Sequence, residues 1–325
     1  MLCYKRILFI NPIFLVTILI LLVGCTQVYS SKGDRSKDFE NCVSQCSSST
    51  CPERKIPLIR RLLQWSCENE CEYECMHEIT AKAKESGGEI LQYHGKWPFY
   101  RMWGMQEPAS VLFSALNGYM HYQYISVFRR QVADGYYMKK FYVAYCCVGV
   151  NAWIWSVIYH SRDFVFTERM DYFSAGFAVL YSLYTTALRV FHIRKTFPLA
   201  SWTFICLVAY TLHVSYLLSG TFDYTYNMTA NVVVASINNA IWLYWTILHL
   251  NKRPDDAWKP AAVGALLSLF LSLELFDFPP IWGVFDAHSL WHLSTIPIIP
   301  FWYNFLLVDA EREDHRERKG KKTMK

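Results

Sequence analysis

Seven apolar stretches follow one another along the chain after Pro108. Each has roughly the length, ~17–25 residues, that a helix needs to cross the hydrocarbon core of a membrane. The loops between them are short, so neighbouring helices are expected to be antiparallel. The pattern predicts an all-α fold, a seven-transmembrane helix bundle over residues 108–308, with helices at about 108–128, 141–159, 172–188, 199–218, 230–250, 261–276 and 290–308.

A shorter apolar run, 7–23, lies near the start of the chain and directly follows Lys5 and Arg6. A basic flank, an apolar run and small residues after it are typical of a secretory signal peptide. An Asn-Pro pair interrupts the run, which favours a cleaved signal over a stable membrane span. Residues 1–30 are therefore predicted to be a signal peptide, and the segment that follows is predicted to face the lumen.

Residues 31–107 form a predicted lumenal domain with six cysteines. An even number of cysteines in an exported segment implies disulfides. The repeated four-residue step stacks thiols on one helix face, so two helices stapled face to face are expected, with fifteen pairings open. A zinc site is the alternative, although structural zinc more commonly mixes His with Cys in reducing compartments. The predicted disulfide cysteines are Cys42, Cys46, Cys51, Cys67, Cys71 and Cys75.

The composition is that of a membrane protein. Of the 325 residues, 53% are hydrophobic, 17% aromatic and only 18% charged, and Trp and Tyr are the residues enriched at membrane interfaces. The net charge of +5 is modest. Because the basic residues lie in short loops and the tail without a groove-reading motif, the sequence excludes nucleic acid as a partner.

Basic residues divide the loops into two kinds. The loops after the first, third and fifth predicted helices carry Lys and Arg, and residues 309–325 add seven more, whereas the alternate loops carry few. Lys and Arg concentrate on the cytosolic side of membrane proteins. The tail 309–325 is therefore predicted to be cytosolic, and the cysteine-rich domain lumenal.

Five polar residues fall at the predicted lumenal ends of helices. Ser156 and His160 close the second helix, and Asp171 opens the third. His288 and His292 open the seventh. Residues four apart share a helix face, and ionisable groups in membrane helices are functional candidates. Because catalytic zinc commonly takes three protein ligands and keeps a fourth position open, the three histidines predict a zinc site.

The arrangement S-x-x-x-H, D and H-x-x-x-H across seven helices resembles the CREST superfamily of membrane hydrolases, which includes alkaline ceramidases and the progestin and adiponectin receptors. Other stretches, together with the cysteine-rich domain, are similar to the GPI-anchor lipid-remodelling phospholipases A2 of that group. These stretches are 95–99 (GKWPF), 106–110 (QEPAS), 151–153 (NAW), 170–173 (MDYF), 275–280 (LFDFPP), 286–288 (DAH) and 291–292 (WH).

The resemblance implies a GPI-specific phospholipase A2, which removes the unsaturated sn-2 acyl chain from the phosphatidylinositol of protein-attached GPI anchors. GPI-anchored proteins and their lipid would be the substrate. The resemblance also implies residence in the Golgi membrane, with the ER membrane as the alternative. GPI lipids occupy the lumenal leaflet, which is the side predicted for the five polar residues.

The five residues can be given roles in this chemistry. Zinc at the three histidines would polarise the ester carbonyl and activate a water. Asp171 suits a base or an orienting carboxylate, and Ser156 suits a donor to the oxyanion. The competing mechanism uses Ser156 as a nucleophile activated by His160. A metal-bound imidazole disfavours it, because such a ring has no free nitrogen to act as a base.

Two other functions stay open from the sequence. A ceramidase-like lipid amidase would share the metal site and differ in its pocket. A non-enzymatic seven-span receptor or scaffold would use zinc only for structure. A structural zinc site would close with a fourth protein ligand, so the polar residues at all five positions count against the scaffold.

The chain contains one N-glycosylation sequon, Asn227-Met228-Thr229. It lies in a loop predicted to face the lumen, where such sequons are modified. Glycosylation at Asn227 is therefore predicted.

Overall fold

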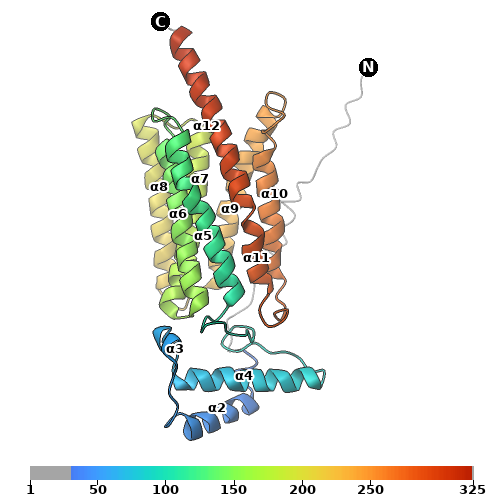
Figure 1. Cartoon of the computed structure of the whole chain (residues 1–325). Coiled ribbons are helices and arrows are strands. Elements are labelled where there is room, and N and C mark those ends of the chain that lie inside the picture. The colour runs from blue at the N-terminus through green and yellow to red at the C-terminus, as the bar shows by residue number, and fades with distance from the viewer. Residues whose placement is uncertain (1–30, 324–325) are drawn as a thin grey trace.

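The computed structural model describes residues 31–323, and the predicted signal peptide, residues 1–30, lies outside them. The protein is an all-α membrane protein with a disulfide-rich N-terminal region (Figure 1). Within the described residues, β structure is limited to three isolated bridges. A bundle of long helices occupies one part of the molecule, and a small helical module lies across one end of it (Figure 1).

The N-terminal module contains the helices α2 (Lys37–Thr50), α3 (Leu58–Leu62) and α4 (Cys67–Glu85). Helix α4 lies between α2 and the bundle (Figure 1). Three disulfides join the segment of α2 to α4, and the pairs are Cys42–Cys75, Cys46–Cys71 and Cys51–Cys67. The partner numbers fall as the first numbers rise, because the two helices run antiparallel. The prediction of disulfides between two facing helices is confirmed, and the alternative of a zinc site is wrong.

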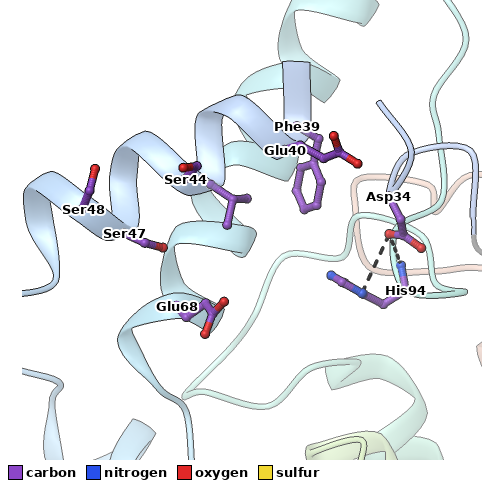
Figure 2. Close-up of a pocket in the computed structure, with 9 residues that line it drawn as sticks. Asp34, Phe39, Glu40, Ser44, Ser47, Ser48, Glu68 and His94 are labelled. Carbon is purple, nitrogen blue, oxygen red and sulfur yellow. Dashed lines mark hydrogen bonds and ion pairs between the residues drawn. The ribbon is translucent and has the colours of Figure 1, made fainter. Parts of the chain in front are cut away.

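The loop after α4 runs back along the module and contacts the first described residues of the chain. The carboxylate of Asp34 accepts a hydrogen bond of 2.7 Å from the backbone N–H of His94 and lies 3.8 Å from Nδ1 of its ring (Figure 2). Beside this contact is a hollow of about 660 Å³ along α2, lined by Ser, Asp and Glu side chains. The backbone N–H of Gly33 also donates to Gln92 O at 3.1 Å, so both ends of the module are tied together.

The bundle consists of helices that run up and down with short connections (Figure 1). They are α5 (Pro108–Gln131), α6 (Lys139–Ser161), α7 (Val165–Val190), α8 (Thr196–Leu218), α9 (Tyr224–His249), α10 (Lys259–Leu271) with a 3₁₀ turn η1 (Ser272–Leu275), α11 (Ala287–Thr295) and α12 (Ile298–Thr323). The connections rich in Lys and Arg lie at the end of the bundle opposite the module, and the C-terminus projects from that same end (Figure 1).

Four stretches of helix are long and apolar enough to cross a membrane by length and composition. They are Lys139–Ser161, Thr196–Leu218, Tyr224–His249 and Ala287–Lys319. Helices α5 and α7 have sufficient length, 24 and 26 residues, but carry more polar side chains. The multi-pass character is therefore established, and the count of seven spans stays a prediction.

The last predicted span, 290–308, is interrupted in the structure. Helix α11 ends at Thr295 and α12 begins at Ile298, with a turn at Ile296 and Pro297 between them. Proline has no N–H for a helical hydrogen bond and its ring clashes with the preceding turn, which explains the break. Helix α12 then continues through the predicted boundary at residue 308 to Thr323.

Helices α5 and α6 pack closely together at Gly149. A Cβ atom at Gly149 of α6 would lie 2.3 Å from Nδ1 of His121 on α5, so glycine is required there. The same Nδ1 lies 2.6 Å from the hydroxyl of Tyr303 on α12. Tyr303 is fully buried in an aromatic core that also contains Phe128 and Trp242. This aromatic core packs against α5, the helix that follows directly after Glu107.

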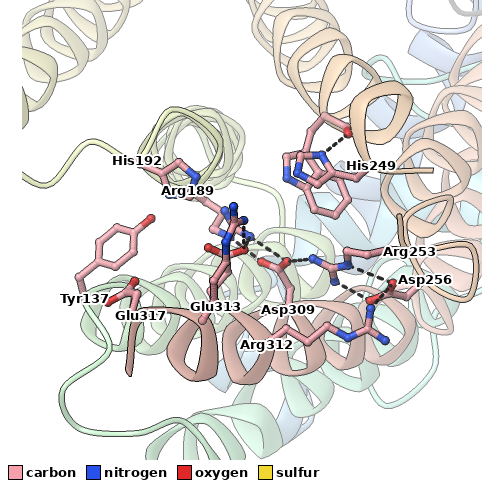
Figure 3. Close-up of polar contacts among 12 residues, drawn as sticks. Tyr137, Arg189, His192, His249, Arg253, Asp256, Asp309, Arg312, Glu313 and Glu317 are labelled. Carbon is pink, nitrogen blue, oxygen red and sulfur yellow. Dashed lines mark hydrogen bonds and ion pairs between the residues drawn. The ribbon is translucent and has the colours of Figure 1, made fainter. Parts of the chain in front are cut away.

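A buried charge network joins three segments of the bundle (Figure 3). The carboxylate of Asp309 on α12 is fully buried and accepts from Nε and Nη2 of Arg189 at 2.5 and 2.8 Å. It also accepts from Nη1 of Arg253 at 2.6 Å. Arg253 and Arg312 both bind Asp256, which continues the network (Figure 3). Residue 309 therefore belongs to the packed bundle, although it was counted with the predicted tail.

We expect Asp309→Ala to destabilise the protein by about 3–5 kcal/mol, because two buried guanidinium groups lose their shared carboxylate. The measurement is the melting temperature of the purified protein in detergent. Asp134→Ala is the matched control, since that carboxylate is 99% exposed and pairs with Lys139. Equal melting temperatures for the two variants would show that the network does not stabilise the bundle.

The module is fixed to the bundle by the segment between η1 and α11. The carboxylate of Asp277 accepts from Nε2 of Gln92 at 2.7 Å and from Nε1 of Trp97 at 2.5 Å. The backbone N–H of Tyr100 donates to Gly283 O at 2.8 Å. Gly283 has φ of +71°, and a Cβ there would lie 2.3 Å from the Tyr100 ring. The module is therefore docked at a defined position over the end of the bundle.

Candidate metal centre

The end of α6 and the start of α5 are tied together next to the module. Pro108 is the first residue of α5, where its fixed φ and missing N–H suit a helix start. The backbone N–H groups of Gln106 and Glu107 donate to the carbonyl oxygens of Ser161 and His160, both at 3.0 Å. These bonds hold the Glu107 side chain beside the last turn of α6.

Helix α11 positions the other two histidines. Asp286 is its N-cap, and its carboxylate accepts from the backbone N–H of Ser289 at 2.8 Å. The Ser289 hydroxyl lies 3.0 Å from the backbone N of Asp286, which completes a capping box. With its start held in this way, α11 presents His288 and His292 one turn apart, their ring centroids 4.5 Å from each other.

The imidazoles of His160, His288 and His292 converge. One nitrogen from each ring lies within 4.8 Å of one from the other two, so the group could hold a metal ion. Nε2 of His160 lies 3.2 Å from Nε2 of His288. His160 and His292 are almost fully buried, 2% and 4% exposed. The predicted ligands therefore come together from two helices far apart in the sequence.

A buried carboxylate orients His160. Oε2 of Glu107 lies 2.7 Å from Nδ1 of His160. A carboxylate accepts hydrogen bonds, so the imidazole proton sits on Nδ1 and the lone pair of Nε2 faces the cluster. Histidines that bind metals commonly donate their other N–H to a carboxylate in this way. The residues present thus fit a metal centre in their orientation as well as their number.

Lys96 from the module completes a chain of charges that ends at His160. Its ammonium binds the carboxylate of Glu107 and lies 3.1 Å from Asp163. Burial by itself raises the pKa of Glu107, but the charge of Lys96 and the hydrogen bonds from Lys96 and His160 outweigh it and hold that pKa well below its ordinary value. Burial lowers the pKa of Lys96, but Glu107 and Asp163 outweigh it and raise that pKa above its ordinary value. Glu107 is therefore a fixed anion beside the histidine cluster.

We expect Glu107→Gln to weaken zinc binding by about 10–100-fold, the usual loss when a carboxylate behind a ligand imidazole is removed. The measurement is competition of the purified protein with a chelator of known affinity. Glu78→Gln, in the exposed face of α4, is the matched control. Unchanged zinc affinity in Glu107→Gln would show that the carboxylate does not support the imidazole.

Ser156 reaches the histidines through a second serine. The hydroxyls of Ser156 and Ser114 lie 2.9 Å apart, and Ser114 Oγ lies 2.9 Å from Nδ1 of His292. All three side chains are buried. The described hydrogen bonds do not join Ser156 to His160, the base that the nucleophilic alternative requires. Ser156 is instead held in a chain of hydroxyls beside His292.

Asp171, at the start of α7, lies close enough to His160 and His288 to interact with both electrostatically. Within the described residues its carboxylate has no hydrogen-bond partner. It is half-buried, so the carboxylate is partly accessible. This environment suits a group that acts on a water or a ligand imidazole.

Sequence reasoning missed the supporting residues. Ser114 carries no spacing signal because its partners lie on α6 and α11. Asn117 is fully buried and donates to His292 O at 2.8 Å, where Thr295 also donates. The signal that could have identified Glu107 is its position directly before a helix-starting proline, in one of the stretches that carry the resemblance. No comparable signal marks Ser114 or Asn117.

Asn227, the predicted glycosylation site, lies in the first turn of α9. Its side chain is only 5% exposed and accepts from Nδ2 of Asn231 at 3.3 Å. Glycosylation stays a prediction, and a glycan at this position would have to be attached before α9 packs into the bundle.

Residues 57–310 of the chain match the Per1-like family. Among similar proteins, the "GPI-specific phospholipase A2-like PGAP3" of Xenopus laevis is 38% identical over 290 residues, covering 87% of this chain and 91% of its own. The Homo sapiens protein of the same name is 37% identical over 300 residues, 90% and 93% of the two chains. The "Protein PER1 homolog" of Schizosaccharomyces pombe is 40% identical over 292 residues, 86% and 88%. No solved structure matches. On this evidence the chain belongs to the Per1-like family, as its resemblance to the GPI-remodelling phospholipases implied.

Proposed function

We propose that this protein is a GPI-specific phospholipase A2 that hydrolyses the sn-2 acyl ester in the phosphatidylinositol of protein-attached GPI anchors. The observation that carries the proposal is the convergence of His160, His288 and His292 at one end of a membrane helix bundle. The names of the relatives point to a GPI lipid, and the imidazoles are suitable donors for metal-assisted ester hydrolysis. GPI-anchored proteins are the proposed substrate partners.

Zinc is the proposed metal, because three imidazole nitrogens with a free fourth position are a usual catalytic zinc set. The Nδ1 atoms of His160 and His292 are bonded to Glu107 and Ser114, which leaves Nε2 of each ring as the ligand atom. Zinc bound there would polarise the ester carbonyl and lower the pKa of a water to about 7. Glu107 keeps the His160 ring in its orientation throughout.

The other polar residues take roles around the ester. We assign Asp171 as the base that accepts a proton from the attacking water, since its carboxylate lies beside two of the imidazoles and is uncommitted. Ser156 is assigned as a hydrogen-bond donor to the oxyanion. Ser114 holds the Ser156 hydroxyl at 2.9 Å and thereby fixes its direction. Ser156 as a nucleophile remains the competing mechanism, and a variant discriminates between the two.

The proposed topology follows the distribution of basic residues. Residues 1–30 would be a signal peptide, the module 31–107 would be lumenal, and residues 309–325 would include the cytosolic end. The histidine cluster lies at the module end of the bundle, so it would face the lumenal leaflet, in which GPI lipids reside. The proposed residence is the Golgi membrane, with the ER membrane as the alternative.

The test uses a GPI-anchored reporter isolated from cells that lack the protein. Complementation with the wild type is expected to remove the unsaturated sn-2 chain, as measured by mass spectrometry of the released phosphatidylinositol. Complementation with His288→Ala is expected to leave that chain in place. Unchanged GPI lipids together with altered ceramides would move the assignment to a lipid amidase.

A further inference from the structure

A cavity of about 540 Å³ lies where the module meets the end of the bundle. The module supplies Trp65, Tyr73 and Lys96 to its walls, and the bundle end supplies Arg162, Asp163 and Glu168. Its volume falls within the ~300–1,000 Å³ that is usual for small-molecule sites. Its walls are polar and aromatic, in contrast to the apolar outer surface of the bundle.

Two guanidinium groups are held rigidly in this cavity. Arg101 lies 3.3 Å from the centroid of the Trp65 ring and 4.3 Å from that of Tyr73. Arg162 lies 3.7 Å from the same Trp65 ring. A guanidinium stacked on an aromatic ring keeps its N–H groups at its edge, where they bind phosphate or carboxylate oxygens. Arg101 also donates to Glu70 at 3.0 Å, and Arg162 donates to Asp163 O at 3.3 Å and to Asn69 Oδ1 at 3.1 Å. Stacking and these bonds hold the remaining N–H groups in place before any ligand arrives.

The cavity also contains a carboxylate with no hydrogen-bond partner among the described residues, that of Glu168. Three acids (Glu72, Asp163 and Glu168) and three cations (Lys96, Arg101 and Arg162) line the walls. Lys96 and Arg101 also pair with Glu107 and Glu70 outside the cavity, so Arg162 is the cation that is left to a ligand. A cavity of this composition is suited to a ligand that carries both signs of charge and a polar ring. It does not suit a simple anion or an acyl chain.

The cavity and the histidine cluster share supporting residues. Lys96 lines the cavity and binds Glu107, which in turn bonds to His160. Asp163 lies just beyond the end of α6, three residues after His160, and Glu168 precedes Asp171 on α7 by three residues, which is about one helix turn. In a phosphatidylinositol the acyl ester is close to the headgroup phosphate. A headgroup bound in the cavity would therefore bring that ester near the imidazoles.

We propose that this cavity binds the polar headgroup of the substrate, an inositol phosphate that carries an amino sugar, as in the first units of a GPI glycan. The proposal rests on the proposed function. The guanidinium of Arg162 contacts the phosphate, and the carboxylate of Glu168 contacts the ammonium of the sugar. The aromatic walls contact the sugar and inositol rings. Plain phosphatidylinositol lacks the ammonium, so Glu168 distinguishes a GPI from the lipid on which it is built.

The test measures binding of an ester-free headgroup, so that it does not depend on hydrolysis. Full-length protein in nanodiscs is titrated with glucosaminyl-inositol phosphate and, separately, with glycerophosphoinositol, by isothermal calorimetry. Glu168→Gln is expected to weaken binding of the first ligand by roughly 10–100-fold, the loss of one charge-assisted hydrogen bond, and to leave the second unchanged. Arg162→Gln is expected to weaken binding of both.

Two controls make the outcome specific. Glu78→Gln removes an exposed carboxylate from the module outside the cavity and is expected to bind like the wild type. His288→Ala is expected to retain headgroup binding while losing hydrolysis. Melting temperatures equal to that of the wild type establish that the cavity variants are folded. If Arg162→Gln does not fold, Glu168→Gln alone tests the inference.

The possible failures are distinguishable. Equal affinity of the wild type and Glu168→Gln for the amino-sugar headgroup, or no binding by the wild type, overturns the inference. If acyl release from a GPI is still observed in that case, the proposed function stands without it. Headgroup binding with the expected variant pattern, but without acyl release, supports the cavity and refutes the hydrolase.

Discussion

His288→Ala is expected to lose bound zinc and acyl-chain release together, with zinc occupancy near zero and hydrolysis below detection. Three imidazoles converge on one position, and loss of one ligand leaves too few donors to retain a catalytic zinc. The same result is expected for His160→Ala and His292→Ala. The measurements are metal content by mass spectrometry and fatty-acid release by the purified variants.

The matched control is His213→Ala, the same replacement on α8, outside the histidine cluster. It should keep zinc and activity. If the three cluster variants lost activity while each retained stoichiometric zinc, the histidines would not be the metal ligands, and the chemistry assigned to them would have to be withdrawn.

Ser156→Ala is expected to lower the rate of hydrolysis by about 10²–10³-fold while zinc content stays at the wild-type level, the usual cost of removing one oxyanion donor. Measurable turnover should remain, because the metal and Asp171 are untouched. Ser114→Ala should cause a smaller loss, up to about tenfold, because it removes a neutral hydrogen bond that only positions Ser156. The rates are measured with the purified variants on one GPI substrate.

The nucleophilic mechanism gives the opposite pattern. A Ser156 that formed an acyl-enzyme would leave almost no turnover when replaced, and it would be labelled by a serine-reactive lipid probe. Labelling of Ser156 in the wild type, absent from Ser156→Ala, would exclude the role of oxyanion donor without affecting the proposed substrate.

Local sequence patterns were sufficient to predict the helices and the crosslinked module. Apolar runs of membrane-spanning length correspond to α5 to α9, because burial in lipid requires backbone hydrogen bonds within the segment. The sixth predicted helix, 261–276, is shorter in the structure, where α10 has 13 residues and the 3₁₀ turn η1 follows it. The four-residue step of the cysteines predicted facing helices. The pairing itself depended on the helices being antiparallel, which no cysteine spacing encodes. The break at Pro297 was visible in the sequence as a proline but was hidden within an apolar run.

The site was predictable only where its residues repeat at helical spacing. This spacing identified two pairs, His288 with His292 and Ser156 with His160. It did not identify Glu107 or Ser114, because Glu107 reaches His160 from 53 residues away, and Ser114 reaches Ser156 and His292 from 42 and 178 residues away. The buried ion pair of Asp309 was not predictable for the same reason, because Arg189 is 120 residues away in the sequence. The structure also gives roles to Asp277, which docks the module, and to Asp286, which caps α11.

The central claim is tested most directly with purified full-length protein in nanodiscs that contain a defined GPI lipid with different sn-1 and sn-2 acyl chains. The quantity measured is the free fatty acid and the lyso-lipid, identified by mass spectrometry before and after removal of zinc. The account predicts release of the sn-2 chain alone, its loss on zinc removal and its return when zinc is restored. Release of the sn-1 chain, or release that persists in the zinc-free protein, would contradict it.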